Sequence, residues 1–221
     1  AAYPPGKGDI TNMIRNYIHR CQKDGVKIVM NCEVTPELIK EEKPDSVIIA
    51  TGSKTLILPI EGIDNPAIIH GSDLLDGKRA AGKKVLVVGG GMVGCETAAF
   101  LGEQEHDVTV IEFRDTVGAD VIHEHRVYLM KDFEDYGIKE ITGAKVCKFY
   151  EDGVEYETAD GVRHESRGYD SVILSMGFRN YNPLEEKIKD LVPETHVIGD
   201  AIRARRALDA TKEAYEVASR I

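Results

Sequence analysis

The chain has 221 residues, of which 42% are hydrophobic, and it carries a formal net charge of −10 at pH 7 with a pI near 5.2. This length and composition are typical of a folded globular protein with one large domain or two small ones. The acidic balance argues against nucleic acid and against an anionic membrane surface as partners, because both require a basic face.

Four cysteines are spread along the chain without a C-x-x-C pair, so their spacing predicts no metal site, redox disulfide or iron–sulfur cluster. The sequence has neither an apolar run of about 18 residues for a membrane span nor a secretory signal segment. A reducing, cytoplasmic location is therefore expected. Because the chain begins at Ala1 and not at a methionine, we expect a fragment of a longer protein.

Residues 1–52 are predicted to form part of an α/β layer. Apolar spacing predicts a helix over residues 10–23 and a strand over residues 26–30. Thr35 followed by Pro36 is typical of the start of a short helix. A further strand over residues 46–50 leads into Thr51-Gly52.

Residues 84–98 have the pattern of a buried strand, a glycine turn and the start of a helix. The G-x-G-x-x-G motif follows a β-branched apolar strand. A second strand over residues 107–111 ends in Glu112, at the spacing of an acid that binds a ribose. Together these features predict a Rossmann-type dinucleotide site.

Each part of the glycine turn (residues 89–94) has a physical role. Gly89 permits the tight turn, Gly91 lets a pyrophosphate approach the backbone, and Gly94 lets the helix pack closely on the strand. The helix start would present free N–H groups to the phosphates. The expected cofactor-binding residues here are Gly89, Gly90, Gly91, Met92, Val93 and Gly94.

Glu112 would accept hydrogen bonds from the ribose hydroxyls and repel a 2′-phosphate, which favours NAD over NADP. Arg114, two residues later, weakens that preference. The structural alternative is a glycine turn that packs a helix onto a sheet without any ligand.

The next segments predict a helix over residues 122–136 and a strand over residues 138–141. Strand-like runs between Val146 and Ser166 are separated by Asp152-Gly153 and Asp160-Gly161. These dipeptides favour tight hairpin turns, so we expect a small antiparallel meander.

A strand over residues 170–175 then ends near Gly177, and a short strand over residues 195–198 ends in Gly199-Asp200. An apolar stripe predicts a final helix over residues 206–221. From its position alone, Asp200 is more typical of a helix cap than of a ligand contact.

Ala50-Thr51-Gly52 after a strand, an inserted nucleotide fold, a meander and a final Gly199-Asp200 together resemble the two-dinucleotide flavoproteins among the pyridine-nucleotide oxidoreductases. More narrowly, these motifs and Pro4-Pro5-Gly6-Lys7 resemble the carboxy-terminal half of the NADH:flavin oxidoreductases related to 2,4-dienoyl-CoA reductase, enoate reductase and trimethylamine dehydrogenase. The resemblance covers nearly the whole chain.

This resemblance implies an α/β fold in which a Rossmann-like NAD(P)-binding domain with a three-stranded meander, residues 55–177, is inserted into a second domain. Residues 1–54 and 178–221 would be two pieces of that FAD- or ADP-binding domain, whose opening glycine-rich βαβ unit is missing. Full-length members carry an upstream barrel. FMN, a 4Fe–4S cluster and the substrate site are therefore expected in a barrel domain that is absent from this chain.

The resemblance also implies roles for residues outside the glycine turn. Glu96 would lie near the nicotinamide ribose or carboxamide, with a favourable acid in the first turn of a helix as the alternative. Gly177 would border the bound NAD. The FAD-type site would contain Thr51, Gly52, Gly199 and Asp200, the last contacting the ribityl or pyrophosphate group.

We expect a fragment of a flavin-dependent NADH oxidoreductase that, at full length, passes hydride from NADH to FAD and on to FMN and an unsaturated, enoate- or enoyl-type substrate. No catalytic residue is assigned, because hydride transfer depends mainly on ring placement. The isolated chain should bind nucleotide without catalysing a reaction. The alternative is a non-catalytic NAD- or ADP-binding module, which the missing βαβ unit favours and the two flanking motifs disfavour. A methyltransferase with the same glycine turn would explain neither flanking motif.

Overall fold

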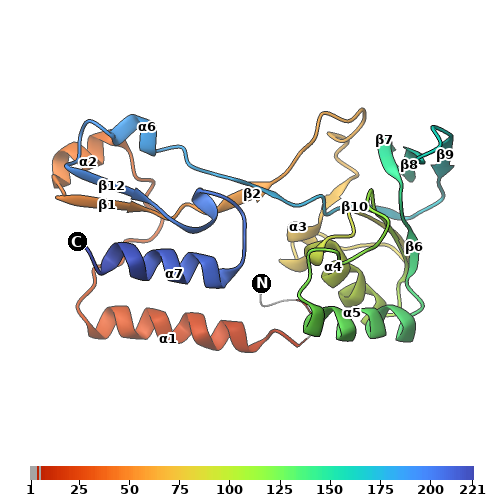
Figure 1. The fold of residues 1–221 in the computed structure, drawn as a ribbon, viewed down its shortest axis with the longest axis horizontal. Helices are drawn as coiled ribbons and strands as arrows, with labels where there is room; N and C mark the ends of the chain where they lie inside the picture. Colours follow the sequence, from red (N-terminus) through yellow and green to blue (C-terminus); the bar gives the residue numbers. More distant parts are fainter. Residues whose placement is uncertain (1–3, 5) are drawn as a thin grey trace. The chain divides into compact units, whose positions relative to one another are not determined.

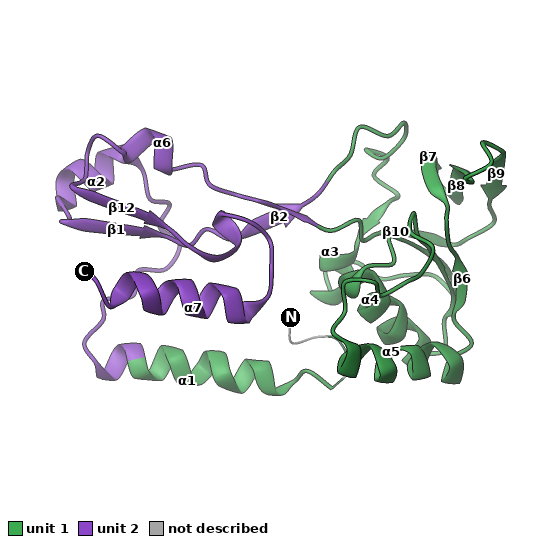
Figure 2. Ribbon diagram, viewed as in Figure 1, with its two compact units in different colours: residues 1–20, 57–177 green, residues 21–56, 178–221 purple. Residues whose placement is uncertain are grey.

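The computed structural model of the chain describes residue 4 and residues 6–221. Pro5 of the amino-terminal motif therefore lies outside the described residues, as does Ala1. The chain divides into two compact units, which are coloured separately in Figure 2. The first unit contains residues 1–20 and 57–177, and the second contains residues 21–56 and 178–221. In the described part of the chain, no helix combines the length and the apolar character needed to cross a membrane.

The first unit is built around a five-stranded sheet in which every neighbouring pair is parallel. Its central strands are mostly apolar, as expected for a parallel sheet covered on both faces. Val85, Leu86 and Val87 are completely buried. The spatial order of the strands is β3 (Ile69–His70), β10 (Ser171–Leu174), β4 (Lys84–Val88), β5 (Asp107–Ile111) and β6 (Lys139–Ile141).

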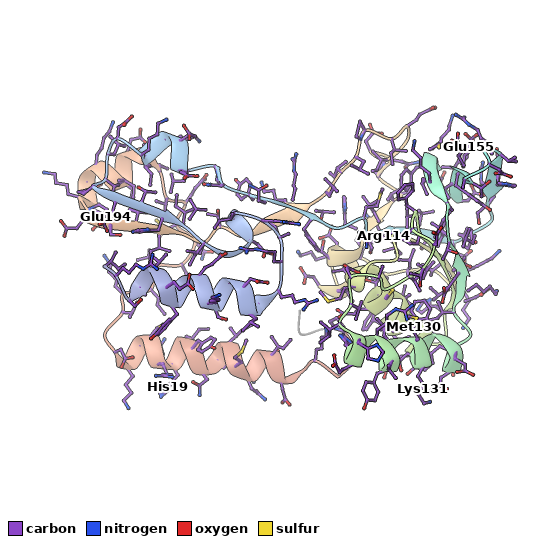
Figure 3. The ribbon with its side chains drawn as sticks, viewed as in Figure 1. His19, Arg114, Met130, Lys131, Glu155 and Glu194 are labelled. Atoms are coloured by element: carbon purple, nitrogen blue, oxygen red, sulfur yellow. The ribbon has the colours of Figure 1, made fainter. Side chains whose placement is uncertain are left out.

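Alternate residues of β4 face two different layers. Val85 and Val87 pack against the helical layer, and Leu86 and Val88 pack against the opposite layer. The helices are α3 (Gly71–Leu75), α4 (Met92–Glu103) and α5 (His123–Asp135), and Figure 1 shows α4 and α5 together on one side of the sheet. On α5, Met130 packs against the core, whereas the next residue, Lys131, pairs with Asp135 at the surface (Figure 3).

The opposite layer is the predicted meander, which forms an antiparallel sheet in the order β7-β8-β9. Phe149 and Val154 are its buried contacts to the parallel sheet. The strands are β7 (Lys145–Tyr150), β8 (Gly153–Glu157) and β9 (Arg163–Ser166).

One turn of the meander differs from the prediction. Tyr150 pairs with Gly153, so the two-residue loop is Glu151-Asp152 and Gly153 is already the first residue of β8. Glycine is needed there for packing and not for a positive φ, because an added Cβ would lie 2.0 Å from the carbonyl oxygen of Ser166. Gly161, in the second turn, does have a positive φ of 78°.

The second unit contains a parallel pair, β1 (Ser46–Ile49) with β12 (Glu194–Val197), and an antiparallel pair, β2 (Ser53–Thr55) with β11 (Phe178–Asn180). Its core is formed by Ile39, Ile49, Leu184, Ile188 and Val192. The helices assigned to it are α2 (Pro36–Glu42), α6 (Glu185–Ile188) and α7 (Ala207–Ala218), with the 3-10 turn η1 (Gly199–Ala201) before α7. At the start of α2, the hydroxyl of Thr35 accepts a hydrogen bond from Leu38 N–H at 3.3 Å, as the Thr-Pro signal predicts.

The strand predicted over residues 26–30 is wrong. These residues form no paired strand, and their apolar side chains are exposed, Met30 to 75%. A strand is stabilised by a neighbouring strand and by a surface that covers its side chains, and an apolar run supplies neither by itself. The predicted helix just before it does form, as α1 (Asp9–Lys23), although none of its residues is buried.

Candidate functional site

The glycine turn connects β4 to α4 at the carboxyl edge of the parallel sheet. Gly89 has a positive φ of 104°, and an added Cβ would lie 2.4 Å from the carbonyl oxygen of Ser175. At Gly94 an added Cβ would lie 1.8 Å from the oxygen of Gly89. Both positions therefore require glycine for the backbone path and for close packing of the helix.

The two middle glycines differ from each other. The space beside Gly90 is filled by the side chains of Glu112 and Val117, each 2.9 Å from where a Cβ would stand. Gly91 is the N-cap residue of α4 with an ordinary φ of −72°. The three atoms nearest to a Cβ on Gly91 all belong to the carboxylate group of Asp120, with the nearer oxygen at 3.3 Å. Gly91 is therefore the position at which an approaching group would face a flexible side chain and no backbone.

Glu112, at the end of β5, contacts the glycine turn directly. Its Oε2 accepts a hydrogen bond from Gly90 N–H at 2.6 Å, and its Oε1 accepts one from Arg114 N–H at 2.9 Å. The acid predicted from the spacing is thus held at the turn by two backbone donors. This arrangement follows from the order of strands, because β4 and β5 are parallel neighbours whose carboxyl ends meet at one edge.

Asp120 is a residue that the sequence analysis missed. Its Oδ1 accepts a hydrogen bond from Met92 N–H, the first helical residue of α4, at 2.9 Å. No local motif marks it. Only the order of the strands could have indicated Asp120, because the loop after β5 lies at the same edge of the sheet as the glycine turn.

Glu96 lies one turn into α4 and is 7% exposed. It is not in the first turn, so the favourable helix-dipole interpretation is wrong for this position. The Glu96 carboxylate instead pairs with the Nζ of Lys7, and His125 Nε2 lies 4.0 Å from it. A buried carboxylate needs such a partner because desolvation penalises its charge.

Cys95, beside Glu96, is completely buried, and its thiol donates to the carbonyl oxygen of Gly90 at 3.2 Å. Burial, followed by the negative charge of Asp120, raises the pKa of Cys95 to about 12. The thiol therefore stays protonated and packs as a small side chain.

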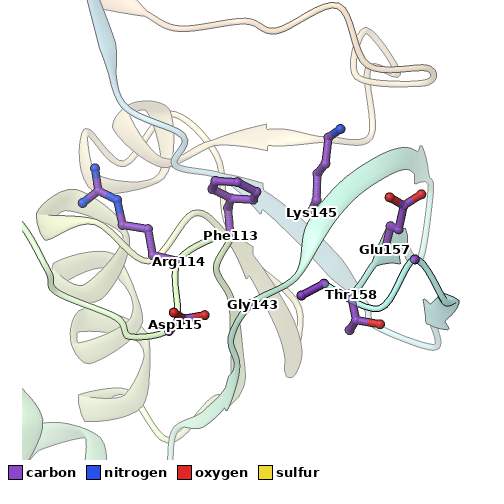
Figure 4. A pocket seen from close by; sticks show the side chains of 9 residues that line it. Phe113, Arg114, Asp115, Gly143, Lys145, Glu157 and Thr158 are labelled. Atoms are coloured by element: carbon purple, nitrogen blue, oxygen red, sulfur yellow. The ribbon is translucent and has the colours of Figure 1, made fainter.

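A pocket of about 490 Å³ opens next to Glu112, between the end of β5 and the meander (Figure 4). Phe113 lies in its wall with 69% of its surface exposed, and Arg114 and Lys145 contribute two cationic side chains. Phe113 and Lys145 were not recognised from the sequence. Asp115 and Glu157 line the same pocket, so the charges balance, and the exposed aromatic ring suits a planar ligand.

The remaining predicted residue of this unit, Gly177, follows β10 with a positive φ of 100°, and an added Cβ would meet no atom within 4 Å. Within the described residues, no group of three or more metal-ligating side chains comes together.

The other predicted residues lie in the second unit. Asp200 Oδ2 accepts a hydrogen bond from the hydroxyl of Ser53 at 3.1 Å, and Oδ1 accepts one from Arg205 N–H at 3.0 Å. Asp200 does not cap α7, because that helix begins at Ala207 and its capping carboxylate is Asp209. The capping interpretation is therefore wrong.

Glu213 of α7 supports this turn and was also missed. Its Oε2 accepts a hydrogen bond from Gly199 N–H at 2.7 Å, and its Oε1 pairs with Arg205. The Arg205 guanidinium and the Gly199 N–H hold the pKa of Glu213 below its usual value. A pocket of about 380 Å³ adjoins the turn. Its lining includes Ala50, Gly52, Gly199, Asp200 and Arg205.

Thr51 donates its hydroxyl to the carbonyl oxygen of Tyr181, and Gly52 has a positive φ of 75°. The structure thus gathers the predicted residues into two groups. Gly89, Gly90, Gly91, Met92, Val93, Gly94, Glu96, Glu112, Arg114 and Gly177 belong to the first unit, and Thr51, Gly52, Gly199 and Asp200 belong to the second.

A parallel sheet with a glycine turn after one strand and an acid after the next defines a dinucleotide-binding α/β protein. The two units are both of the α/β class. Comparison with known families agrees and is more specific. The chain belongs to the pyridine nucleotide-disulphide oxidoreductase family, whose model matches residues 7–195.

Individual relatives match nearly the whole chain. An NADH oxidase from Thermoanaerobacter brockii is 31% identical over 227 residues, covering 100% of this chain and 35% of the relative. A cinnamate reductase from Clostridium sporogenes is 30% identical over 221 residues, which cover 99% of this chain and 33% of the relative. A solved structure of 2-naphthoyl-CoA reductase with 2-naphthoyl-CoA is 31% identical and has a TM-score of 0.92. The match covers 100% of this chain and 33% of that chain. The chain spans about a third of the length of the curated relatives it matches.

Proposed function

We propose that this chain is the nucleotide-binding part of a flavin-dependent NADH oxidoreductase. Residues 55–177 would hold NAD(H), and residues 1–54 and 178–221 would be parts of an FAD- or ADP-binding domain. The observation that carries the proposal is the contact of Glu112 with Gly90 N–H at 2.6 Å, which holds a carboxylate at the glycine turn, where it would bind a ribose.

The first unit fits a dinucleotide. N–H groups of the first turn of α4 have no intrahelical acceptor and would donate to the pyrophosphate, which would pass over Gly91. Glu112 would accept hydrogen bonds from the adenosine ribose hydroxyls. The pocket beside it would take the adenine, with Phe113 against the ring. Glu96 and Gly177 would lie toward the nicotinamide.

The choice between the two dinucleotides depends on charge. The Glu112 carboxylate would repel a 2′-phosphate, whereas Arg114 and Lys145 would attract one. Because Glu112 is held in place by two backbone donors and would touch the ribose itself, we assign NADH as the preferred cofactor.

The second unit offers a smaller site of the same chemistry. Asp200 and the backbone of Gly52 and Gly199 border its pocket, with Thr51 next to Gly52. These groups would hold part of an FAD or ADP molecule, Asp200 through the hydroxyl or pyrophosphate groups. When bound, FAD would supply the two-electron acceptor for hydride.

In the full-length protein we propose that hydride passes from NADH to FAD, and that the reducing equivalents go on to FMN and an unsaturated substrate. The FMN, a 4Fe–4S cluster and the substrate site would lie in a separate barrel domain. The support is the similarity of this chain to a cinnamate reductase and to 2-naphthoyl-CoA reductase, in each of which the matching region is about one third of the relative's length. The names of both relatives describe reduction of an unsaturated aromatic acid or its thioester.

A non-catalytic NAD- or ADP-binding module is the second candidate, because the glycine turn and the Glu112 contact account for nucleotide binding without any reaction. Spectroscopy of the full-length gene product separates the two. A protein that contains FAD and FMN, and whose flavin absorbance is bleached by anaerobic NADH, supports the oxidoreductase. A full-length protein that binds NADH but contains no flavin would contradict it and support the module.

A further inference from the structure

Helix α4 lacks a capping side chain of its own. Its N-cap residue is Gly91, which has no side chain to accept a hydrogen bond from the first turn. The Oδ1 of Asp120, 28 positions later, accepts the N–H of Met92 at 2.9 Å instead. The end of the helix that would bind a phosphate is therefore bonded to a carboxylate of the same chain.

The same position of Asp120 also brings its carboxylate close to Gly91. A Cβ built on Gly91 would lie 3.3 Å and 3.5 Å from the two carboxylate oxygens of Asp120. The carboxylate thus covers the same face of the turn that glycine leaves open. A phosphate bonded to Met92 N–H and passing over Gly91 would need the volume that Asp120 fills.

The backbone that carries Asp120 is fixed, whereas its side chain is exposed. Gly118 N–H donates to the carbonyl oxygen of Gly90 at 2.7 Å, and Val117 is completely buried. Arg126 also donates to the carbonyl oxygen of Val117, at 3.1 Å. Asp120 itself is exposed to solvent. Rotation of one side chain, without movement of the loop, would therefore open the turn.

On the basis of the proposed function, we propose that Asp120 is an exchangeable occupant of the phosphate position. It caps α4 when no nucleotide is bound, and it swings into solvent when a dinucleotide takes the Met92 N–H. Asp120 thereby sets the affinity of the turn for phosphate-bearing ligands. The stability that it gives to the free protein is the same interaction that a nucleotide must displace.

The charge of Asp120 adds to this effect. A pyrophosphate brings two negative charges to a turn that already contacts the carboxylates of Glu112 and Asp120. Glu112 would be retained because it binds the ribose, so Asp120 is the carboxylate whose removal should favour binding. Two like unit charges about 4 Å apart oppose each other even in water, by an amount equivalent to roughly a fivefold change in affinity.

The test compares Asp120→Ala and Asp120→Asn with the parent chain. The alanine variant removes both the cap and the charge, whereas the asparagine variant keeps an acceptor and removes the charge. We expect NADH and ADP to bind about five- to tenfold tighter to Asp120→Ala, with Asp120→Asn between the two, and adenosine to bind equally to all three. The free Asp120→Ala chain should melt at a lower temperature, because it has lost a helix cap.

Asp107→Asn is the matched control. Asp107 carries the same charge as Asp120, but it lies at the amino end of β5, where it pairs with Lys139 at 2.8 Å, whereas Asp120 lies in the loop that follows β5. The NADH affinity of the Asp107→Asn variant should stay within about twofold of that of the parent chain. This variant accounts for the general effect of removing one negative charge from an acidic chain.

Opposite shifts of stability and affinity are the signature of an exchangeable cap, since a purely structural residue would lower both. If the parent binds NADH and the folded Asp120 variants bind it no tighter, this inference is wrong and the proposed function stands. If neither the parent nor any variant binds NADH or ADP, both are wrong.

Discussion

The Nζ of Lys7 is paired with the carboxylate of Glu96, 89 positions later in the chain, and the Glu96 side chain is only 8% exposed. The pair fixes the segment before α1 to the first turns of α4. His125, 4.0 Å from the same carboxylate, is the other basic group beside it.

Removal of Lys7 should therefore destabilise the protein. Lys7→Met leaves the Glu96 carboxylate buried without its main partner, and we expect a loss of about 1–3 kcal/mol in the free energy of unfolding, measured by urea denaturation with circular dichroism. Lys78→Met, which breaks an exposed pair with Asp76, is the control and should cost less than about 1 kcal/mol. Equal effects of the two substitutions would show that the Lys7–Glu96 pair contributes nothing specific.

The two glycine positions at the start of α4 should respond differently to valine. Gly91→Val places its new atoms against the flexible Asp120 carboxylate, so the chain should fold, melt at a temperature lowered about as much as in Asp120→Ala, and lose NADH binding. Gly94→Val forces a Cβ to 1.8 Å from the oxygen of Gly89 and should prevent folding of this unit. A folded Gly91→Val chain with parental NADH affinity would count against the glycine turn as a phosphate site.

Cys95 should be inert as long as the chain is folded. With its pKa raised to about 12, its thiol is protonated at pH 8, and we expect iodoacetamide to modify the exposed Cys32 but to reach Cys95 only after unfolding, as mass spectrometry of peptides would show. Rapid alkylation of Cys95 in the native protein would contradict its burial.

The same shift predicts a pH dependence. The folded pKa of Cys95 lies above the ordinary thiol pKa of 9.0, so the unfolded chain releases this proton first as pH rises. The stabilising contribution is complete below about pH 9 and is lost between pH 9 and 12. A Cys95→Ala variant should lose less stability than the parent over this interval, and an identical decline would refute the assignment.

The parts of the fold that local sequence determines were predictable. The turn after β4 was recognised because a β-branched strand, Gly89 at a positive φ and an acid at the end of the next strand each have a local cause. The helix after Thr35 was likewise encoded by a cap, and the second turn of the meander by Asp160-Gly161, whereas the first turn lies one residue earlier than predicted.

The failures share a physical reason. Three of the missed contacts join residues that are distant in sequence, and no local spacing specifies such contacts. They are Lys7 with Glu96, Met92 with Asp120, and Gly199 with Glu213. The apolar run over residues 26–30 did not become a strand because strand formation depends on a partner strand as well as on composition. Positions of long-range polar partners require the tertiary fold.

The central claim is that the glycine turn and Glu112 bind NAD(H), and titration of the purified chain with NADH and NADPH, by calorimetry, tests it most directly. We predict saturable NADH binding that is at least about tenfold tighter than NADPH binding, equivalent to about 1.4 kcal/mol, because a 2′-phosphate would meet the Glu112 carboxylate. Absence of NADH binding, or equal or tighter binding of NADPH, would contradict the account.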